Sequence, residues 1–324
     1  MNGLNCCFSS NKQSGTDSAV STFSVVAYDS ETGELGVAVA SHYFAVGAVV
    51  PWAEADVGAV ATQANVNVAL GPRGLHLLKE GLNARDVLER IRLEDQLADR
   101  EGRQLAIVDA KGNIASFTGA DAPAWAGGRE GKSWSVQGNL LSGPQVIEAM
   151  GCALDSTRVD LAERLFAALK AGDDAGGDSR GRQSACILVV GKGRGRNVNN
   201  DRPISVHVDD NEQPFPELRR LLDLNLAYLH IDRAYKAVTG GNLPEAARSR
   251  ARATNYCINP DTQLRVGFLD YLLGNKAEAL ALFVKVKPRV PDFEALWRGT
   301  VIGRPAFKAI LEDTEFMRVL FPGH

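Results

Sequence analysis

The sequence predicts an α+β protein in which two antiparallel sheets pack between layers of helices, followed by an all-helical region. Strand and helix patterns come in blocks, in the order strands, two helices, strands, two helices, strands. Alternating βαβ units would interleave them one by one. From Phe215 onward the apolar residues recur every three or four positions, which is the spacing of helices. Periodicity alone also fits a generic α+β fold.

Composition divides the 324 residues into three parts. Residues 1–20 are rich in Ser, Asn and Gly and lack the basic start and apolar run of a signal peptide, so we expect a disordered tail. Residues 21–212 carry the predicted strands, and residues 213–324 have helical patterns throughout. The Pro214-Phe215-Pro216 segment marks the boundary between the last two parts.

The first predicted structure is a hairpin of two strands, Thr22–Tyr28 and Gly36–Ser41, joined by a polar turn that contains Gly33. Pro51 and Trp52 then begin a segment that is interpreted as a short polar link. Runs of small, apolar and β-branched residues predict six further strands at Val57–Gln63, Gln104–Asp109, Ile114–Thr118, Ser133–Gln137, Ser184–Val190 and Ile204–Val208.

Helix signals are equally local. Pro72 suits the first turn of a helix that ends at Gly81, and Asn83 is the expected N-cap of the next helix. Two more helices are expected, one from Ser142 to about Met150 and one over Leu161–Lys170. A long helix after Phe215 should present one apolar seam, made of Leu221, Leu224, Tyr228, Ile231, Tyr235 and Val238.

A short repeat lies in the helical region. Gly241-Asn242, with Glu245-Ala246 shortly after, recurs 33 positions later as Gly274-Asn275 with Glu278-Ala279. This spacing is close to the period of about 34 residues in tetratricopeptide helical hairpins. The alternative is a small helical bundle that packs on the first domain.

Bulk composition excludes several functional classes. A net charge of −3 with 23% charged residues gives no reason to expect nucleic acid or an anionic membrane as a partner. No segment has the length of a membrane span. The five cysteines are odd in number and scattered, as in reduced proteins of the cytoplasm. No cysteine or histidine cluster suggests a metal, and no organic cofactor is expected.

Four polar segments interrupt the apolar strands, at strand ends or in glycine-rich turns where backbone can approach a ligand. Each by itself fits an ordinary turn or sheet edge. They are Ser41-His42, Thr62–Asn67, Gln137–Gly143 and Gly176–Ser184.

Thr22 opens the first strand, and hydrolases with an N-terminal nucleophile (Ntn hydrolases) begin with such a hairpin. In these enzymes the α-amino group of a terminal Thr, Ser or Cys serves as the general base for its own side chain, because that amine titrates near neutrality. A threonine that opens a strand usually does no more than fill a β position.

Six motifs in order resemble the bacterial family called domain of unknown function 1028. They begin at Thr22, Ala45, Gly58, Gly71, Gln137 and Gly176 and read TFSVVAYD, AVGAVVPW, GAVATQA, GPRGL, QGNLLSG and GGDSRGRQS. The family is grouped with the Ntn hydrolases, so the resemblance implies a four-layer αββα sandwich and amide-bond chemistry without a cofactor. Members often carry a C-terminal extension described as peptidoglycan-binding, and residues 215–324 resemble such an extension in position.

In many members the threonine that matches Thr22 directly follows the initiator Met, whereas 21 residues precede Thr22 here. Either this tail is cleaved after Ser21, or translation starts near Thr22, or the site is inert, because an amide nitrogen cannot act as a base. The Ser41-His42 pair matches a position where members carry Ser and a basic residue. The usual Asn-Pro is Asn67-Val68 here.

Catalytic roles are therefore predicted for Thr22 as nucleophile and for Ser41 or His42 as the group that tunes its proton. The candidate oxyanion donors are Gly138, Asn139 and the backbone of the Gly176–Gly177 turn. An ion pair of Asp178 with Arg180 or Arg182 is the structural alternative for that segment, and Arg73 is either a carboxylate-binding residue or a solvated one. The predicted substrate-binding residues are Gln63, Asn65, Arg73, Gly138, Gly177, Asp178, Arg180 and Gln183.

The resulting hypothesis is a cytoplasmic amidohydrolase that acts on a small molecule with a non-standard amide or peptide-like bond. A second hypothesis is a non-catalytic binding protein whose helical region docks a protein or a glycan. A third is an inactive homologue whose tail blocks the site. The sequence leaves self-association open.

Overall fold

The computed structural model describes residues 22–157, 159–303 and 305–322. The expectation for residues 1–20 and the cysteines Cys6 and Cys7 lie outside these ranges. The three cysteines within them, Cys152, Cys186 and Cys257, are free thiols. In the same ranges no helix is both long and apolar enough to cross a membrane.

The larger sheet has six antiparallel strands in the order β10-β9-β2-β1-β8-β7. Its centre is the predicted hairpin, which the structure confirms with Thr22 opposite Ser41 and Tyr28 opposite Leu35. β8 pairs with the other edge of β1, so β1 lies between two neighbours. The strands are β1 (Thr22–Tyr28), β2 (Leu35–Ser41), β7 (Gly127–Gly131), β8 (Trp134–Asn139), β9 (Ser184–Val190) and β10 (Ile204–Val208).

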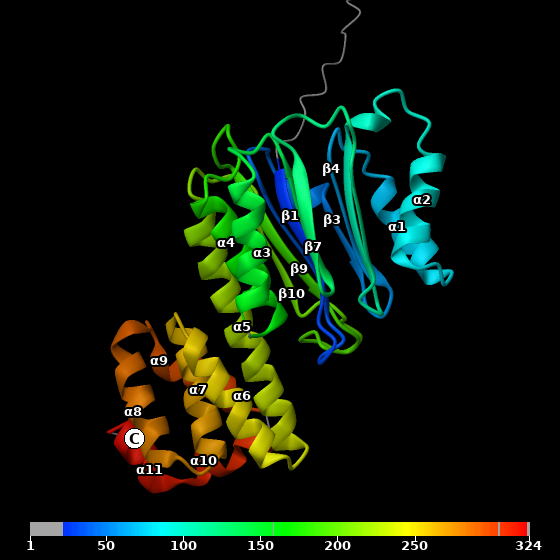
Figure 1. Cartoon of the computed structure of the whole chain (residues 1–324). Helices are drawn as coiled ribbons and strands as arrows, with labels where there is room; N and C mark the ends of the chain where they lie inside the picture. The colour runs from blue at the N-terminus through cyan, green and yellow to red at the C-terminus, as the bar shows by residue number, and fades with distance from the viewer. Residues whose placement is uncertain (1–21, 158, 304, 323–324) are drawn as a thin grey trace, which may run out of the picture.

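The smaller sheet has four antiparallel strands in sequence order: β3 (Pro51–Glu54), β4 (Gly58–Ala64), β5 (Arg103–Asp109) and β6 (Ile114–Thr118). The two sheets face each other, as Figure 1 shows, across apolar residues such as Val26, Val39 and Ala106. Side chains alternate between the faces of a strand. Phe23 and Val25 therefore face the opposite side of β1, toward helices.

Each sheet carries a pair of helices on its outer face (Figure 1). On the four-stranded sheet these are α1 (Leu70–Lys79) and α2 (Ala84–Glu94), and Asn83 caps α2 as predicted by accepting from the backbone of Asp86 at 3.1 Å. On the six-stranded sheet they are α3 (Gln145–Ser156) and α4 (Leu161–Asp174). The predicted α+β organisation with two antiparallel sheets and helices is therefore present.

The C-terminal part is helical, as predicted. Its first helix, α5, runs from the side of β10 into a bundle with its own core of aromatic residues around Phe268, Phe283 and Trp297 (Figure 1). The helices are α5 (Pro214–Thr239), α6 (Leu243–Tyr256), α7 (Pro260–Leu272), α8 (Lys276–Val286), α9 (Phe293–Val301), α10 (Lys308–Glu312) and α11 (Thr314–Leu320). Short 3-10 turns lie at Val46–Ala48, Arg100–Gly102, Lys287–Arg289 and Pro305–Phe307.

The structure differs from the predicted elements at five places. β3 replaces the expected polar link, and β7 has no predicted counterpart. Helix α3 continues to Ser156 rather than to about Met150, and α4 continues to Asp174 rather than to Lys170. The expected seam of α5 is mostly half-buried, because this helix packs on two bodies in turn and buries a different stripe, which includes Leu218, Leu222, Leu226 and Leu229.

Candidate active site

Thr22 begins the central strand of the six-stranded sheet with polar residues on both sides. Its Cα partner on β2 is Ser41, and its partner on β8 is Asn139. The Thr22 hydroxyl donates to the Ser41 hydroxyl at 3.3 Å, and all three side chains are buried. The structure thus brings together three of the four residues that were predicted to be catalytic.

A cluster of buried carboxamides lies beside Thr22, where the ends of the two sheets meet. Gln63 on β4 donates to the Gln104 side-chain oxygen at 2.7 Å and to the Thr22 carbonyl at 3.5 Å. The Asn139 amide donates to the same Gln104 oxygen at 3.1 Å, and Gln104 itself donates to the Gly138 carbonyl at 2.9 Å. These bonds join the Thr22 end of β1 to the opposite sheet.

Gln104 connects this cluster but is absent from the predicted site residues. It also donates to the Thr118 hydroxyl at 2.9 Å and to the Gly127 carbonyl at 3.3 Å. The available signal is a polar side chain that opens an apolar strand, which is the same signal that selected Thr22. Its partners come from four other strands, so only the tertiary structure reveals its role.

The segment after α4 folds over the ends of β2 and β8. Asp178 is buried, and its carboxylate accepts from the backbone N–H of His42 at 2.7 Å and from that of Arg180 at 2.9 Å. The Arg180 side chain returns to the same carboxylate at 3.2 Å. Asp178 and Arg180 therefore form an ion pair that holds the loop to β2, in keeping with the structural alternative for this segment.

Arg182 follows the same pattern with a different carboxylate, since its guanidinium binds Asp173 at the end of α4. This hydrogen bond raises the pKa of Arg182. Arg182 and Asp178 are thus paired with separate partners.

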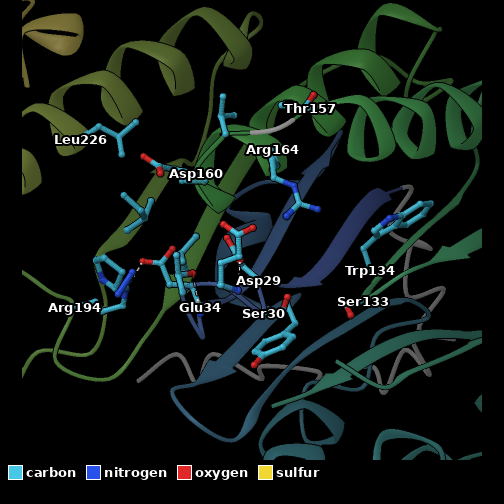
Figure 2. A pocket seen from close by; sticks show the side chains of 18 of the residues that line it. Asp29, Ser30, Glu34, Ser133, Trp134, Thr157, Asp160, Arg164, Arg194 and Leu226 are labelled. Atoms are coloured by element: carbon cyan, nitrogen blue, oxygen red, sulfur yellow. Dashed lines mark hydrogen bonds and ion pairs between the residues drawn. The ribbon is translucent and has the colours of Figure 1, made fainter. Parts of the chain in front are cut away.

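A cavity of about 450 Å³ lies at this end of the six-stranded sheet. Ser41 lines it, so the residue that accepts from Thr22 also faces the cavity. Buried Phe23 and Phe215 give it an apolar side, while the loop after α4 gives it a polar one. Its remaining lining includes Ala40, Ser142, Asp173, Gly176, Gly177, Asp178, Arg182, Ser184 and Glu212. A larger cavity lies at the opposite end of the same sheet (Figure 2).

The glycines of the site have different roles. Gly176 and Gly177 were candidates for oxyanion donors, but their N–H groups donate to the carbonyls of Asp173 at 3.1 Å and Gly172 at 3.0 Å within the turn. Gly138 is required by packing, because a Cβ there would lie 2.6 Å from the Leu141 side chain and 3.0 Å from the Thr22 carbonyl oxygen.

The side chains of two predicted site residues, His42 and Gln183, lie against other groups. His42 is exposed, and its ring nitrogen Nδ1 lies 3.3 Å from the Arg182 carbonyl oxygen. Gln183 donates through its backbone to the Ser41 carbonyl at 3.1 Å, whereas its side chain donates to Asp210 at 3.0 Å. Gln183 therefore supports β2 by its main chain.

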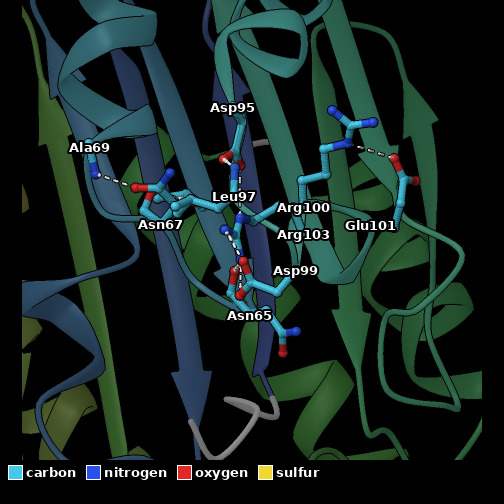
Figure 3. A network of polar contacts seen from close by, with 10 residues as sticks. Asn65, Asn67, Ala69, Asp95, Leu97, Asp99, Arg100, Glu101 and Arg103 are labelled. Atoms are coloured by element: carbon cyan, nitrogen blue, oxygen red, sulfur yellow. Dashed lines mark hydrogen bonds and ion pairs between the residues drawn. The ribbon is translucent and has the colours of Figure 1, made fainter. Parts of the chain in front are cut away.

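Asn65 directly follows β4, and Arg73 lies on α1. The Asn65 carbonyl accepts from the buried guanidinium of Arg103, which also binds Asp95 at 3.0 Å and Asp99 at 2.7 Å (Figure 3). Burial alone would lower the pKa of Arg103, but these two carboxylates outweigh it and raise the pKa. Arg73 forms a two-pronged ion pair with Glu94 of α2 at 2.8 Å.

Comparison with known proteins identifies the family. A family model described as family of unknown function (DUF1028) matches residues 22–218, which is more than half of the chain. The chain belongs to this family. A crystal structure of a protein of the same family from Silicibacter pomeroyi is similar to it, with 30% sequence identity and a TM-score of 0.57 over 63% of this chain and 85% of that chain. No curated protein matches the chain.

Proposed function

We propose that this DUF1028 protein is an amidohydrolase with Thr22 as its nucleophile, and that its two sheets and two helix pairs form the four-layer αββα sandwich of Ntn hydrolases. One observation carries the proposal. Thr22 begins the central strand, its hydroxyl donates to Ser41 on one neighbouring strand, and Asn139 flanks it on the other. A cavity bordered by Ser41 lies at the same end of the sheet.

The proposed chemistry uses the first residue of a chain that starts at Thr22. The α-amino group takes the proton of the Thr22 hydroxyl while Oγ1 attacks the carbonyl carbon of the substrate amide. The tetrahedral intermediate collapses as its C–N bond breaks, and the leaving amine receives that proton. Water then hydrolyses the ester on Thr22, with the same amino group as base, and regenerates the hydroxyl.

Two side chains have supporting roles in this scheme. The Asn139 carboxamide is adjacent to Thr22 across the strand pair, and amide N–H groups stabilise a developing oxyanion. Ser41 orients the Thr22 hydroxyl through their shared hydrogen bond. The buried position of both groups favours them, because hydrogen bonds are stronger where water is excluded.

The scheme requires that Thr22 carry a free amine, and this provides the test. We would compare the full chain with a form in which Met directly precedes Thr22, and confirm both N-termini by intact mass. Each form is incubated with N-acyl p-nitroanilides, whose cleavage releases a coloured amine. We expect release only from the form that begins at Thr22, together with a transient acyl adduct on that residue.

Matched variants assign the nucleophile. In the form that begins at Thr22, Thr22→Ser should keep activity because it retains a hydroxyl, and Thr22→Ala should abolish it. Ser24→Ala is the control, since Ser24 lies two residues along the same face of β1 and is buried. Among the residues that the structure describes, its hydroxyl has no hydrogen-bond partner. Full activity of the Thr22→Ala variant would exclude Thr22 as the nucleophile. Binding without cleavage in every form would instead favour the non-catalytic binding protein.

We propose a docking role for the helical region, with a tetratricopeptide-like arrangement. Its support is the repeat: Gly241-Asn242 precedes α6 and Gly274-Asn275 precedes α8, so the repeat marks the turns of two helical hairpins, α5 with α6 and α7 with α8. Both glycines have positive φ, 75° and 86°, which ends a helix before the next begins. A cytoplasmic location, inferred from the scattered thiols, is part of the same proposal.

A further inference from the structure

A cavity of about 730 Å³ lies at the end of the six-stranded sheet opposite Thr22. The β1–β2 turn, the start of α4 and the middle of α5 line it (Figure 2). Arg252 of α6 lines it as well. Small-molecule sites commonly measure about 300–1,000 Å³ and lie between domains. This cavity has that size and lies where the helical region joins the sheets.

His230 of α5 lines this cavity and is 1% exposed. Within the described residues neither of its ring nitrogens has a hydrogen-bond partner. The ring stacks on Tyr256, with the ring centroids 5.9 Å apart, and Nε2 lies 3.8 Å from Asp160. Burial, and secondarily the charge of Arg233, lowers the pKa of His230 to about 4. A neutral imidazole offers one N–H donor and one nitrogen acceptor.

Two carboxylates that face the cavity, those of Glu34 and Asp160, form ion pairs with arginines. Glu34 binds Arg194 at 2.8 Å and Arg233 at 3.9 Å, and Asp160 binds Arg252 at 3.4 Å. These carboxylates are thus neutralised by arginines of the chain itself.

Arg164 of α4 is different. Figure 2 shows its side chain extending from α4 into the cavity. Within the described residues it forms no ion pair, and its buried Nε has no hydrogen-bond partner. An unpaired guanidinium in a partly buried site is costly unless an anion binds it. Trp134, Leu154 and Leu226 line other parts of the wall.

We propose that this cavity binds a small carboxylate that also carries an amide, of the size of a short acylated peptide. Arg164 pairs with the carboxylate through two parallel N–H donors. The neutral His230 ring exchanges hydrogen bonds with the amide, which likewise presents one N–H and one carbonyl. The apolar wall accommodates the aliphatic part of the ligand. This site is separate from the Thr22 site and does not depend on its activity.

The test titrates the full chain at pH 7 with N-acetyl-Ala-Ala by calorimetry, and with the C-terminal amide of the same peptide as the uncharged comparison. We expect saturable binding of the acid and binding of the amide at least about tenfold weaker, as for the loss of one charge-assisted hydrogen bond. Arg164→Gln should weaken the acid by a similar factor. His230→Phe keeps the stacking ring and should weaken both peptides.

Arg318→Gln is the control, since Arg318 is an exposed arginine of α11 away from the cavity. Circular dichroism verifies that each variant is folded. Equal affinity for acid and amide, binding that survives both Arg164→Gln and His230→Phe, or an absence of saturable binding would each overturn the proposal.

Discussion

The hydroxyl of Thr22 donates a hydrogen bond to the hydroxyl of Ser41 across two adjacent strands, at 3.3 Å. Ser41 ends β2 and lines the cavity, whereas Thr22 begins β1 behind it. This pair connects a nucleophile candidate to the space where a substrate could lie. Its orientation depends on the β1–β2 register, because a slip of one residue would turn Ser41 to the opposite face.

Ser41→Ala tests this relationship. In the form that begins at Thr22, we expect kcat to fall by about tenfold, as for the loss of one hydrogen bond that orients the reacting hydroxyl. KM for the p-nitroanilide should change little. Steady-state kinetics of Ser41→Ala and of the Ser24→Ala control would measure both constants. An effect on KM alone would show that Ser41 contacts the substrate and does not orient Thr22.

Gln104→Leu should destabilise the fold although it preserves the size of the side chain. The Gly138 carbonyl and the amides of Gln63 and Asn139 would lose their bonds to Gln104, and buried polar groups without partners cost about 1–3 kcal/mol each. We expect a loss of about 3 kcal/mol in the free energy of unfolding, measured in urea. Gln96→Leu, on the exposed surface, should change it by less than about 0.5 kcal/mol. Similar values for the two variants would contradict the role of the carboxamide cluster.

His230 should make stability depend on pH. Its pKa is about 4 in the folded state, whereas the ordinary value of a solvated histidine is 6.5, so below pH 6.5 the unfolded chain binds a proton that the native chain excludes. Stability from this group therefore falls as pH decreases from about 6.5 to about 4, by about 3 kcal/mol in total. The charged and titratable groups around the ring are Asp160, Arg233, Glu245, Arg252 and Tyr256.

His230→Phe removes the titration and keeps a ring against Tyr256. The free energy of unfolding of the parent should therefore fall relative to that of the variant as the pH is lowered from about 7 to about 4.5. Gln96→Leu, which changes an exposed side chain that does not titrate, should show a constant difference over the same range. A constant difference for His230→Phe as well would mean that the imidazole takes up its proton without penalty in the native state.

Two glycines provide a matched test of helix packing. A Cβ at Gly71 of α1 would lie 2.2 Å from the Trp52 ring on β3, whereas a Cβ at Gly299 of α9 would meet nothing within 4 Å. Gly71→Ala should lower the melting temperature by overpacking, at a cost of about 1–3 kcal/mol. Gly299→Ala should raise it, because alanine is favoured over glycine in helices by about 1 kcal/mol. A melting temperature of Gly71→Ala that stays the same or rises would contradict the close approach of α1 to β3.

The two strands absent from the prediction share a physical cause. β3 begins with Pro51, and β7 contains Gly127, Gly128 and Gly131, so neither has the composition of a strand. Both lie at sheet edges, where only one side needs backbone partners and proline or glycine is tolerated. They become strands because they pair with β4 and β8, and local sequence preference does not reveal this pairing.

The sequence by itself determined the type of every described α-helix and strand except β3 and β7, because alternation, caps and turns act over a few residues. Its motifs pointed to the Thr22 end of the first strand. Only the tertiary structure decided which residues meet there. Ser41 and Asn139 flank Thr22 because β2 and β8 pair with β1, and Gln104 bonds to Asn139 from the opposite sheet. Arg73 instead pairs with Glu94. Such contacts depend on strand order and sheet packing, which join residues far apart in the chain and leave no local pattern.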